Sequence, residues 1–254
     1  MRSLKTKKFD SIQLSEMEQV KLMNRVDKKF WFHTNQLPAL LDMISQDYFL
    51  LHINGQNLLQ YSTVYFDTFE SRMFAAHHNG KLNRYKIRRR SYVSSGISFF
   101  EVKFKNNKGR TIKKRIPSDF EVSDFTDQEV DFINEVTPFC HDELRPSLIN
   151  NFSRLTLVNK NFKERCTIDL NLQFHQGDKT VSLDDLVIVE VKSDGRSSAS
   201  PLLTTLRDQR IKPAGFSKYC VGRTVTDTGL KRNAFKGKIR SIEKLLQTEN
   251  KLYY

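Results

Sequence analysis

Charged side chains recur at every second position in three neighbouring segments, residues 84–90, 99–105 and 110–117. Side chains two residues apart lie on the same face of a β-strand. One face of these three segments would therefore carry Arg84, Lys86, Arg88, Arg90, Glu101, Lys103, Lys105, Thr111, Lys113 and Arg115. Like charges on adjacent strands destabilise their pairing. This face therefore favours a strongly anionic ligand, whose charge would offset the repulsion.

The opposite face of the same segments is apolar. It carries Tyr85, Ile87, Phe100, Val102, Phe104, Ile112 and Ile116. Residues 106–109 read Asn-Asn-Lys-Gly and predict a hairpin turn between the second and third segments. An ordinary sheet would place the apolar face on the core and the charges in water. Three adjacent strands with the same charge instead favour a charged face that lines a ligand site.

Length and charge limit the possible partners. The chain has 254 residues, with 42 Lys and Arg against 29 Asp and Glu, and a formal net charge of +13. This balance predicts an anionic partner: nucleic acid, a phosphorylated small molecule or an acidic membrane surface. Cys140, Cys166 and Cys220 are far apart and lack metal-binding spacing, as expected for reduced thiols in a cytoplasmic protein. No apolar stretch approaches the roughly 20 residues of a membrane-spanning helix, so we expect a soluble protein.

The remaining sequence also alternates between polar and apolar residues. Further strands are expected at residues 25–33, 61–67, 151–160, 165–174, 180–182 and 186–192, and helices at residues 34–46, 126–135, 198–209 and 232–247. A short helix is expected near residues 15–22, and a polar connection holds His77 and His78. If helices cover the apolar strand faces, including Ile87, Val102, Ile112 and Leu155, the charged faces must line an interior. We therefore predict an α+β fold in which about eight antiparallel strands close into a barrel, with helices packed outside and a charged tunnel inside.

Missing motifs exclude several chemistries. The chain has no glycine-rich phosphate loop, no dinucleotide-binding turn, no nucleophile elbow and no zinc-finger spacing. The adjacent His77 and His78 would point apart, which disfavours a shared metal ion. A base-stacking platform places aromatic and basic side chains on one face, whereas Phe100 and Phe104 lie on the face away from the arginines. The pattern favours phosphates without bases, although charge alone leaves nucleic-acid binding open.

Seven short motifs follow one another in a specific order. They are Asp27-Lys28-Lys29-Phe30-Trp31-Phe32-His33, Tyr65-Phe66-Asp67, Tyr85-Lys86-Ile87-Arg88-Arg89-Arg90, Phe100-Glu101-Val102-Lys103, Ile112-Lys113-Lys114-Arg115, Val189-Glu190-Val191-Lys192 and Phe216-Ser217-Lys218-Tyr219. As a set they resemble the polyphosphate polymerase domain, or VTC domain, of the triphosphate tunnel metalloenzyme (CYTH-like) superfamily. The resemblance covers residues 24–223.

This resemblance implies an eight-stranded antiparallel barrel that transfers the γ-phosphate of ATP to a growing polyphosphate chain with Mn²⁺ or Mg²⁺. Seven bases match the phosphate-binding residues of the family: Lys29, Arg88, Arg90, Lys103, Lys113, Arg154 and Lys218. Glu190 matches the metal-binding glutamate. Further substrate contacts are expected from Lys86, Glu101, Lys105, Arg115 and Lys192. The implied partners are ATP and inorganic polyphosphate, without nucleic acid, and a membrane assembly would need a separate partner chain.

One motif departs from the hydrolytic members of the superfamily, whose first strand reads Glu-x-Glu-x-Lys. Here it reads Arg25-Val26-Asp27-Lys28-Lys29, so the first carboxylate is missing. This loss disfavours a two-metal triphosphatase. A triphosphatase or a protein that only binds polyphosphate is the second hypothesis, and a nucleic-acid-binding domain is the third. We divide the chain into a leader with a short helix at 1–23, a tunnel domain at 24–223 and a helical extension at 224–254; the conformation around Lys218 is not predicted.

Overall fold

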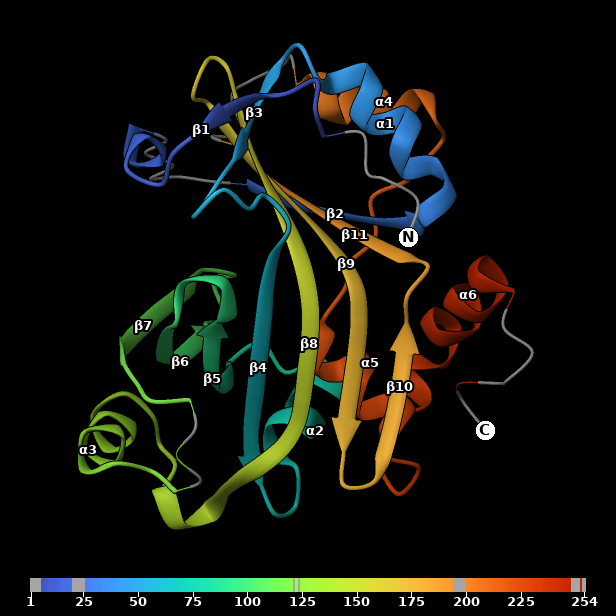
Figure 1. The fold of residues 1–254 in the computed structure, drawn as a ribbon. Coiled ribbons are helices and arrows are strands. Elements are labelled where there is room, and N and C mark those ends of the chain that lie inside the picture. The colour runs from blue at the N-terminus through green and yellow to red at the C-terminus, as the bar shows by residue number, and fades with distance from the viewer. Residues whose placement is uncertain are drawn as a thin grey trace. The chain divides into compact units, whose positions relative to one another are not determined.

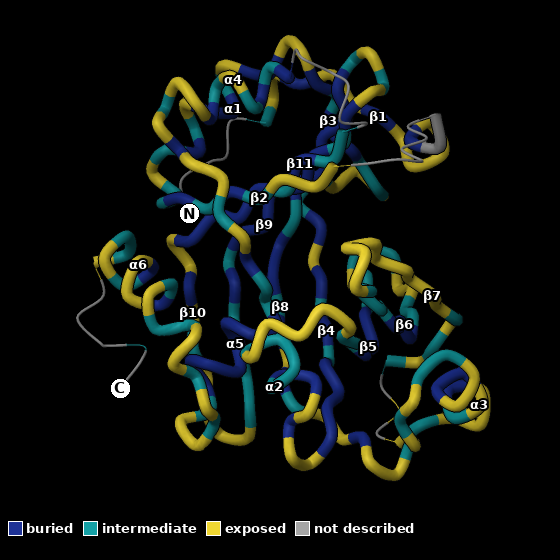
Figure 2. The backbone as a smooth tube through the Cα atoms, turned by 180° about the vertical axis from the view of Figure 1, so that it is seen from behind, coloured by how far each residue is buried: buried dark blue, intermediate teal, exposed yellow. Residues whose placement is uncertain are grey.

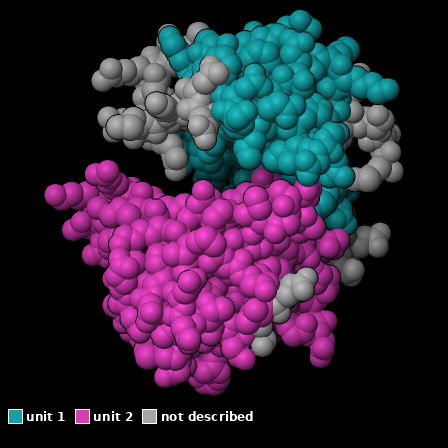
Figure 3. Space-filling view, turned by 60° about the vertical axis from the view of Figure 1, so that its left-hand side comes forward, with its two compact units in different colours: residues 1–60, 152–172, 183–216 teal, residues 61–151, 173–182, 217–254 magenta. Residues whose placement is uncertain are grey.

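The computed structural model describes residues 6–19, 26–120, 122, 124–193, 200–247 and 252. The chain forms two compact units, each assembled from separate stretches of sequence (Figure 3). Unit 1 comprises residues 1–60, 152–172 and 183–216, and unit 2 comprises residues 61–151, 173–182 and 217–254. Val20, Leu22, Arg25 and Ser198, which belong to elements expected from the sequence, lie outside the described residues.

The strands of unit 1 are mostly antiparallel (Figure 1). β11 (Leu186–Ser193) pairs with β2 (Val26–His33) on one side and with β9 (Glu164–Gln176) on the other. β8 (Leu144–Asn159) belongs to unit 1 from residue 152 onward, and this part pairs with β3 (Tyr48–Leu51), which pairs in parallel with the short β1 (Asp10–Ile12). The helical segments are η1 (Glu16–Gln19), η2 (Thr34–Gln36), α1 (Leu37–Ile44) and α4 (Pro201–Asp208). The strands and helices of this unit were expected from the sequence, apart from β1 and β3.

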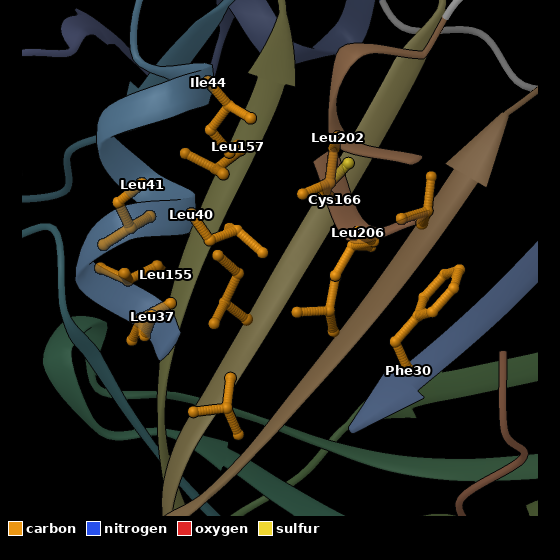
Figure 4. Packing of buried hydrophobic residues seen from close by; sticks show 14 of the residues in the cluster. Phe30, Leu37, Leu40, Leu41, Ile44, Leu155, Leu157, Cys166, Leu202 and Leu206 are labelled. Atoms are coloured by element: carbon orange, nitrogen blue, oxygen red, sulfur yellow. The ribbon is translucent and has the colours of Figure 1, made fainter. Parts of the chain in front are cut away.

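Two amphipathic helices, α1 and α4, cover the apolar faces of these strands (Figure 4). The apolar residues of α1 recur at helical spacing and are fully buried: Leu37, Leu40, Leu41 and Ile44. They share one core cluster with Leu155 and Leu157 of β8 and with Leu202 and Leu206 of α4. Burying each such side chain stabilises the fold by about 1.5–3 kcal/mol. This packing determines which strand face is covered, so the alternate, polar residues must lie on the other face.

In the described part of unit 2, β4, β5, β6 and β7 pair in that order and are antiparallel. Their bounds are β4 (Leu59–Thr68), β5 (Arg84–Tyr92), β6 (Ile97–Lys105) and β7 (Thr111–Pro117), and β10 (Lys179–Leu183) pairs with β9. The helical segments are α2 (Arg72–His78), η3 (Val93–Ser95), α3 (Asp127–Val136), η4 (His141–Glu143), α5 (Lys218–Thr226), η5 (Asn233–Phe235) and α6 (Lys236–Leu246). The predicted β6–β7 turn is confirmed. Gly109 adopts a φ of +78° there, a value that residues with a Cβ rarely adopt.

Helices also cover the apolar face of the unit 2 strands. Ile87 and Val102 are buried in one cluster with Met73 of α2 and with Phe132 and Ile133 of α3. The expected burial is therefore confirmed for both strand residues, as it is for Leu155 in unit 1. It is wrong for Ile112, which is 45% exposed. Ile112 lies on β7, the last strand of the sheet, which is exposed along nearly all of its length (Figure 2).

The prediction of a closed eight-stranded barrel was wrong. The described residues form an eleven-stranded sheet whose main path runs β2-β11-β9-β8-β4-β5-β6-β7. In the part of the chain that is described, no ladder joins β2 to β7, so the path is open. Alternating side chains identify the residues that share a face, but closure also depends on strand tilt and stagger, which alternation does not specify.

His77 and His78 lie in the last turn of α2, where an irregular polar connection had been expected. Burial, reinforced by the charge of Lys86, lowers the pKa of His77 to about 3. The ring of His77 lies 6.1 Å from that of Phe235, between centroids. His77 is therefore a neutral packing residue at physiological pH.

Candidate functional site

The charged faces of β5, β6 and β7 form a group of bases in unit 2. The backbone register sets Lys103 opposite both Lys86 and Lys113, and it sets Arg88 opposite Glu101. We refer to Lys86, Arg88, Arg90, Glu101, Lys103 and Lys113 as the unit 2 basic cluster. Arg88 and Arg90 are only 8% and 7% exposed, although arginine is rarely buried without a partner. The alternation of the sequence predicts this grouping.

Glu101 is the carboxylate within the unit 2 basic cluster and is fully buried. Its Oε2 accepts a hydrogen bond from Arg88 Nε at 2.7 Å, and its Oε1 pairs with the Lys113 ammonium. Burial raises the pKa of this carboxyl, but Arg88, Arg90 and Lys113 outweigh that effect and hold the pKa at about 2. Glu101 is therefore ionised at neutral pH, and it orients two of the bases that surround it.

Lys103 has the least compensated charge in the cluster. No described carboxylate lies within ion-pair distance of its ammonium, and Arg88, burial and Arg90 lower its pKa well below the usual range. Lys86 donates a hydrogen bond to Ser217 Oγ at 3.1 Å, and burial lowers its pKa as well. The repulsion that lowers the pKa of Lys103 would be relieved by an anion bound beside it.

Two polar residues of β4 extend the unit 2 basic cluster, although no role was predicted for them. Thr63 Oγ1 accepts a hydrogen bond from Arg90 Nε at 3.1 Å. Tyr65 lies opposite Arg88 in the ladder and is 4% exposed. The signal that could have identified them is the alternation of the strand expected at residues 61–67, which places both side chains on one face.

Arg89 lies on the helix-covered face of β5 and does not belong to the cluster. Its guanidinium donates two hydrogen bonds to Glu129 of α3, at 3.0 Å from Nε and 2.6 Å from Nη2. Glu129 also forms the capping box of α3 with Thr126, at the predicted start of the helix. This buried pair joins β5 to α3 and has a structural role.

Lys218 begins α5, whose helical conformation was not predicted. Ser217 caps this helix by accepting a hydrogen bond from the Cys220 amide at 3.2 Å, and the same oxygen accepts the bond from Lys86. The next residue, Tyr219, donates a hydrogen bond to Asp67, whose carboxylate also accepts amide hydrogens at the start of α2. These bonds hold the first turn of α5, and Lys218 with it, close enough to Tyr65 to affect the pKa of that phenol.

Lys105 and Arg115 lie at the margin of the charged face. Lys105 is half-buried and lies opposite Thr111. The Arg115 guanidinium is exposed and lies 4.1 Å from the centroid of the Phe99 ring. Exposed charges are screened by water and salt. We therefore expect weaker ligand contacts from these two residues than from Arg88 or Lys103.

Unit 1 carries a different arrangement of charges, in which bases and carboxylates are paired. Glu190 accepts hydrogen bonds from Lys29 at 2.5 Å and from Lys192 at 2.8 Å. Arg154 binds Asp169 through two hydrogen bonds, from Nε at 2.5 Å and from Nη2 at 2.9 Å. We refer to these five residues as the unit 1 paired cluster. Burial raises the pKa of Glu190, but Lys192 and Lys29 outweigh it and hold the pKa far below its usual range.

The oxygen atoms around Glu190 fit a hard divalent cation. The register sets Thr167 of β9 opposite Glu190. Thr167 is 5% exposed, and its Oγ1 has no hydrogen-bond partner among the described residues. Carboxylate and hydroxyl oxygens, completed by phosphate oxygens of a substrate, suit Mg²⁺ or Mn²⁺. Either ion would replace at least one of the two ammonium groups that now bind Glu190.

The residues expected to bind phosphate therefore fall into two sets. Unit 2 brings together Arg88, Arg90, Lys103 and Lys113, with Lys218 on α5. Lys29 and Arg154 belong to unit 1, where each is paired with a carboxylate. Among the described residues, no helix has the length and apolar character required to cross a membrane.

Comparisons with known proteins identify the family and the fold. Residues 24–226 match the VTC domain. Among solved structures, a proposed adenylate cyclase from Bacillus halodurans has a TM-score of 0.51 at 13% identity, covering 77% of this chain and 96% of that chain. A proposed adenylyl cyclase from Hippeastrum, described as having a dominant triphosphatase activity, has a TM-score of 0.51 at 14% identity, covering 78% and 95%. At these identities the likeness shows the fold alone. No curated protein matches the chain in sequence.

Proposed function

The chain belongs to the VTC domain family of the triphosphate tunnel (CYTH-like) superfamily, and from this membership we propose that it is a polyphosphate polymerase. The proposed reaction transfers the γ-phosphate of ATP to the end of an inorganic polyphosphate chain. The observation that supports it most is the unit 2 basic cluster, in which five bases accompany one carboxylate. Such an excess of positive charge on one face of the sheet suits a chain of phosphates, which carries negative charge at every unit.

The residue types of the cluster suit phosphate oxygens. Arginine presents a planar fork of donors that matches two phosphate oxygens, and lysine presents a compact charge. Arg88 and Arg90 lie two residues apart on β5, so they offer forks at successive positions along one strand. Lys103 adds an ammonium without a carboxylate partner in the described structure. The register of the strands, rather than a flexible loop, thus orders these donors before the ligand binds.

In phosphoryl transfer the protein mainly positions the reacting groups and neutralises their charge, and it takes little part in covalent chemistry. A terminal phosphate oxygen of the growing chain bonds to the γ-phosphorus of ATP, while the bond between that phosphorus and the bridging oxygen breaks and its electron pair leaves with ADP. The attacking oxygen is already ionised at neutral pH, so no general base is required. Catalysis then consists of positioning the two phosphate groups and neutralising their charge. Arg88, Arg90, Lys103 and Lys113 are proposed to supply that neutralisation.

The metal requirement follows from the superfamily and from Glu190. In unit 1, Glu190 and Thr167 would hold Mn²⁺ or Mg²⁺. A bound divalent ion supplies positive charge to phosphate oxygens. Until it binds, Lys29 and Lys192 keep Glu190 ionised and oriented. Glu190→Gln should therefore weaken the binding of Mn²⁺, measured by calorimetry, and abolish metal-dependent turnover.

A tunnel triphosphatase is the second candidate. The Hippeastrum protein of similar fold is described as having a dominant triphosphatase activity. A hydrolase must activate water, and the strand 25–29 offers Asp27 without the first carboxylate of the hydrolytic motif. The polymerase therefore remains the proposal, and the products of the reaction distinguish the two.

The deciding experiment follows all phosphate products from purified protein with ATP and Mn²⁺. A polymerase releases ADP in step with acid-labile polymeric phosphate and yields little free orthophosphate early in the reaction. Lys103→Ala should remove ADP and polymer together, by about 100-fold, as expected for loss of one donor to a developing charge. Lys114→Ala is the matched control, because Lys114 points to the other face of β7 and pairs with Glu135 at 3.1 Å.

Three results would contradict the proposal. Orthophosphate matching ADP, without polymer, would identify a triphosphatase. Tight binding of duplex nucleic acid without ADP release would identify a nucleic-acid-binding domain. Equal loss of activity in Lys103→Ala and Lys114→Ala would show that the effect comes from net charge rather than from the cluster.

A further inference from the structure

A tyrosine of β4 lies among the bases of unit 2 without an assigned role. We propose that Tyr65 contacts the bound phosphate chain and donates its phenolic hydrogen to a phosphate oxygen within the unit 2 basic cluster. The identity of this ligand rests on the proposed function, whereas the contact itself is argued from the geometry of β4, β5 and α5.

The position of Tyr65 is set by the strand ladder. Tyr65 lies directly opposite Arg88, on the face of β4 that also carries Thr63, the acceptor for Arg90. The phenolic oxygen accepts a hydrogen bond from Arg88. No described residue accepts the phenolic hydrogen in return, although the side chain is 4% exposed. A buried hydroxyl normally uses its hydrogen, so an acceptor from outside the chain is expected here.

The ring of Tyr65 is held in place before any ligand binds. It lies 5.1 Å from the ring of Tyr219, between centroids, at an interplanar angle of 35°. Tyr219 is fixed in turn by its hydrogen bond to Asp67, whose other acceptor positions bind amides of α2. The phenolic oxygen thus has a defined position among the bases, as a binding group needs in order to act without reorganisation.

Because of the charges around Tyr65, the protonation of its phenol should depend on whether the ligand is bound. Lys86, Arg88 and Arg90 face it from β5, and Lys218 and Tyr219 face it from α5. Burial raises the pKa of Tyr65, but Arg88, Arg90, Lys218 and Lys86 outweigh burial and lower the pKa below its usual value near 10. A bound polyphosphate would neutralise these bases and so restore the protonated phenol. Binding at alkaline pH should therefore take up a proton at Tyr65, and that proton is the one donated to phosphate.

The first test measures tripolyphosphate binding by calorimetry in Tyr65→Phe, which removes only the hydroxyl. Loss of a hydrogen bond to a charged group weakens binding by about tenfold or more. The matched control is Tyr85→Phe. Tyr85 is the residue before Lys86, but it lies on the opposite face and stacks on Phe104 at 4.6 Å between centroids. Tyr85→Phe should bind tripolyphosphate as the unsubstituted protein does.

The second test follows the tyrosinate signal of the unsubstituted protein, and Tyr65→Phe serves only to assign that signal. At alkaline pH, addition of tripolyphosphate should decrease the ultraviolet absorbance of tyrosinate, and Tyr65→Phe should abolish that decrease. A tyrosine that only packs against Tyr219 would give no such signal. Unchanged tyrosinate absorbance, together with equal affinity in Tyr65→Phe, would overturn the inference.

The experiments can contradict the role of Tyr65 and the polymerase activity independently of each other. If Tyr65→Phe binds tripolyphosphate normally and polymer still forms, the role of Tyr65 is wrong and the polymerase stands. If tripolyphosphate binding depends on Tyr65 but ATP yields no polymer, the phosphate contact stands and the polymerase is wrong.

Discussion

The two charged clusters of this protein satisfy their charges in different ways. In the unit 1 paired cluster, Glu190 binds two lysines and Asp169 binds Arg154 through two hydrogen bonds. In the unit 2 basic cluster, Glu101 alone offsets five bases, and the pKa of Lys103 is lowered by its neighbours. The first cluster is electrostatically satisfied by the fold itself. The second has an excess of positive charge that the fold must tolerate.

The composition of the chain does not distinguish bases that are paired within the fold from bases that need an external anion, whereas the structure does. A net charge of +13 describes the whole chain, whereas the unit 2 basic cluster gathers five bases and one carboxylate on β5, β6 and β7. Repulsion among buried charges destabilises the free protein and is relieved by an anion, so the ligand should stabilise the protein through unit 2. The unit 1 paired cluster should gain little from a bare anion, because Lys29, Lys192 and Arg154 are already bound to carboxylates. Substitutions that change one cluster at a time can test this distinction.

Glu101→Gln should have the largest effect on stability. Removing the negative charge leaves Arg88 and Lys113 without their partner, and breaking such a buried pair costs about 3 kcal/mol or more. The variant should also be stabilised more strongly by tripolyphosphate than the unsubstituted protein, because the ligand then supplies all of the missing negative charge. Thermal unfolding with and without tripolyphosphate measures both effects.

Glu129→Gln is the matched control for that experiment. Glu129 is also a buried carboxylate bound to an arginine, Arg89, but it lies on the helix-covered face. It should lower stability without enlarging the stabilisation by tripolyphosphate. If the ligand rescues both variants equally, the excess charge of the unit 2 basic cluster does not determine ligand binding.

Lys103→Met and Arg154→Met should change stability in opposite directions. Lys103→Met removes a charge that its neighbours repel and should stabilise the free protein by about 1 kcal/mol. Arg154→Met leaves Asp169, which is 3% exposed, without its bidentate partner and should destabilise by about 2 kcal/mol. Denaturant unfolding of both variants measures these values. If neither substitution stabilises the protein, or if both destabilise it, the two clusters do not differ in how their charges are satisfied.

The pH dependence of the free energy of unfolding of Lys103→Met tests whether relief of charge repulsion causes the expected stabilisation. The folded-state pKa of Lys103 lies well below its ordinary value of about 10.5, so the unfolded chain binds more protons between those two pKa values. Stability should therefore rise with pH across that window, and Lys103→Met should reduce the rise. An unchanged slope would show that repulsion at Lys103 is not what the substitution relieves.

The faces of the strands could be predicted because the pattern is local. A two-residue period is enough to place Arg88 and Arg90 on one face and Ile87 on the other. The start of α3 at Thr126 could also be read from a capping box within a few residues. These features depend on neighbours in sequence, and the structure confirms them.

Features that depend on distant partners could not be predicted in the same way. Whether β2 and β7 pair depends on the tilt and stagger of every strand between them. Arg89 interrupts an apolar face, and its partners, Glu129 on α3 and the carbonyl oxygen of Asp124, are distant in sequence. The helix α5 begins at a serine cap, but its place beside the cluster depends on the bond from Tyr219 to Asp67.

Arg115→Ala should have the smallest effect, and it tests how far the unit 2 basic cluster extends. Arg115 lies opposite Glu101 in the β6–β7 ladder, but its exposed guanidinium stacks over Phe99 at 4.1 Å from the ring centroid. An exposed cation–π contact is worth about 0.5–1 kcal/mol, and water screens the charge. We therefore expect tripolyphosphate affinity to fall less than about threefold, by calorimetry, with little change in stability. Lys113→Ala, two residues away on the same face of β7, should weaken binding far more, because the register sets Lys113 opposite Lys103 and Glu101 orients its ammonium. Equal losses from the two variants would mean that the whole exposed strand binds the ligand, and that buried excess charge is not what distinguishes unit 2.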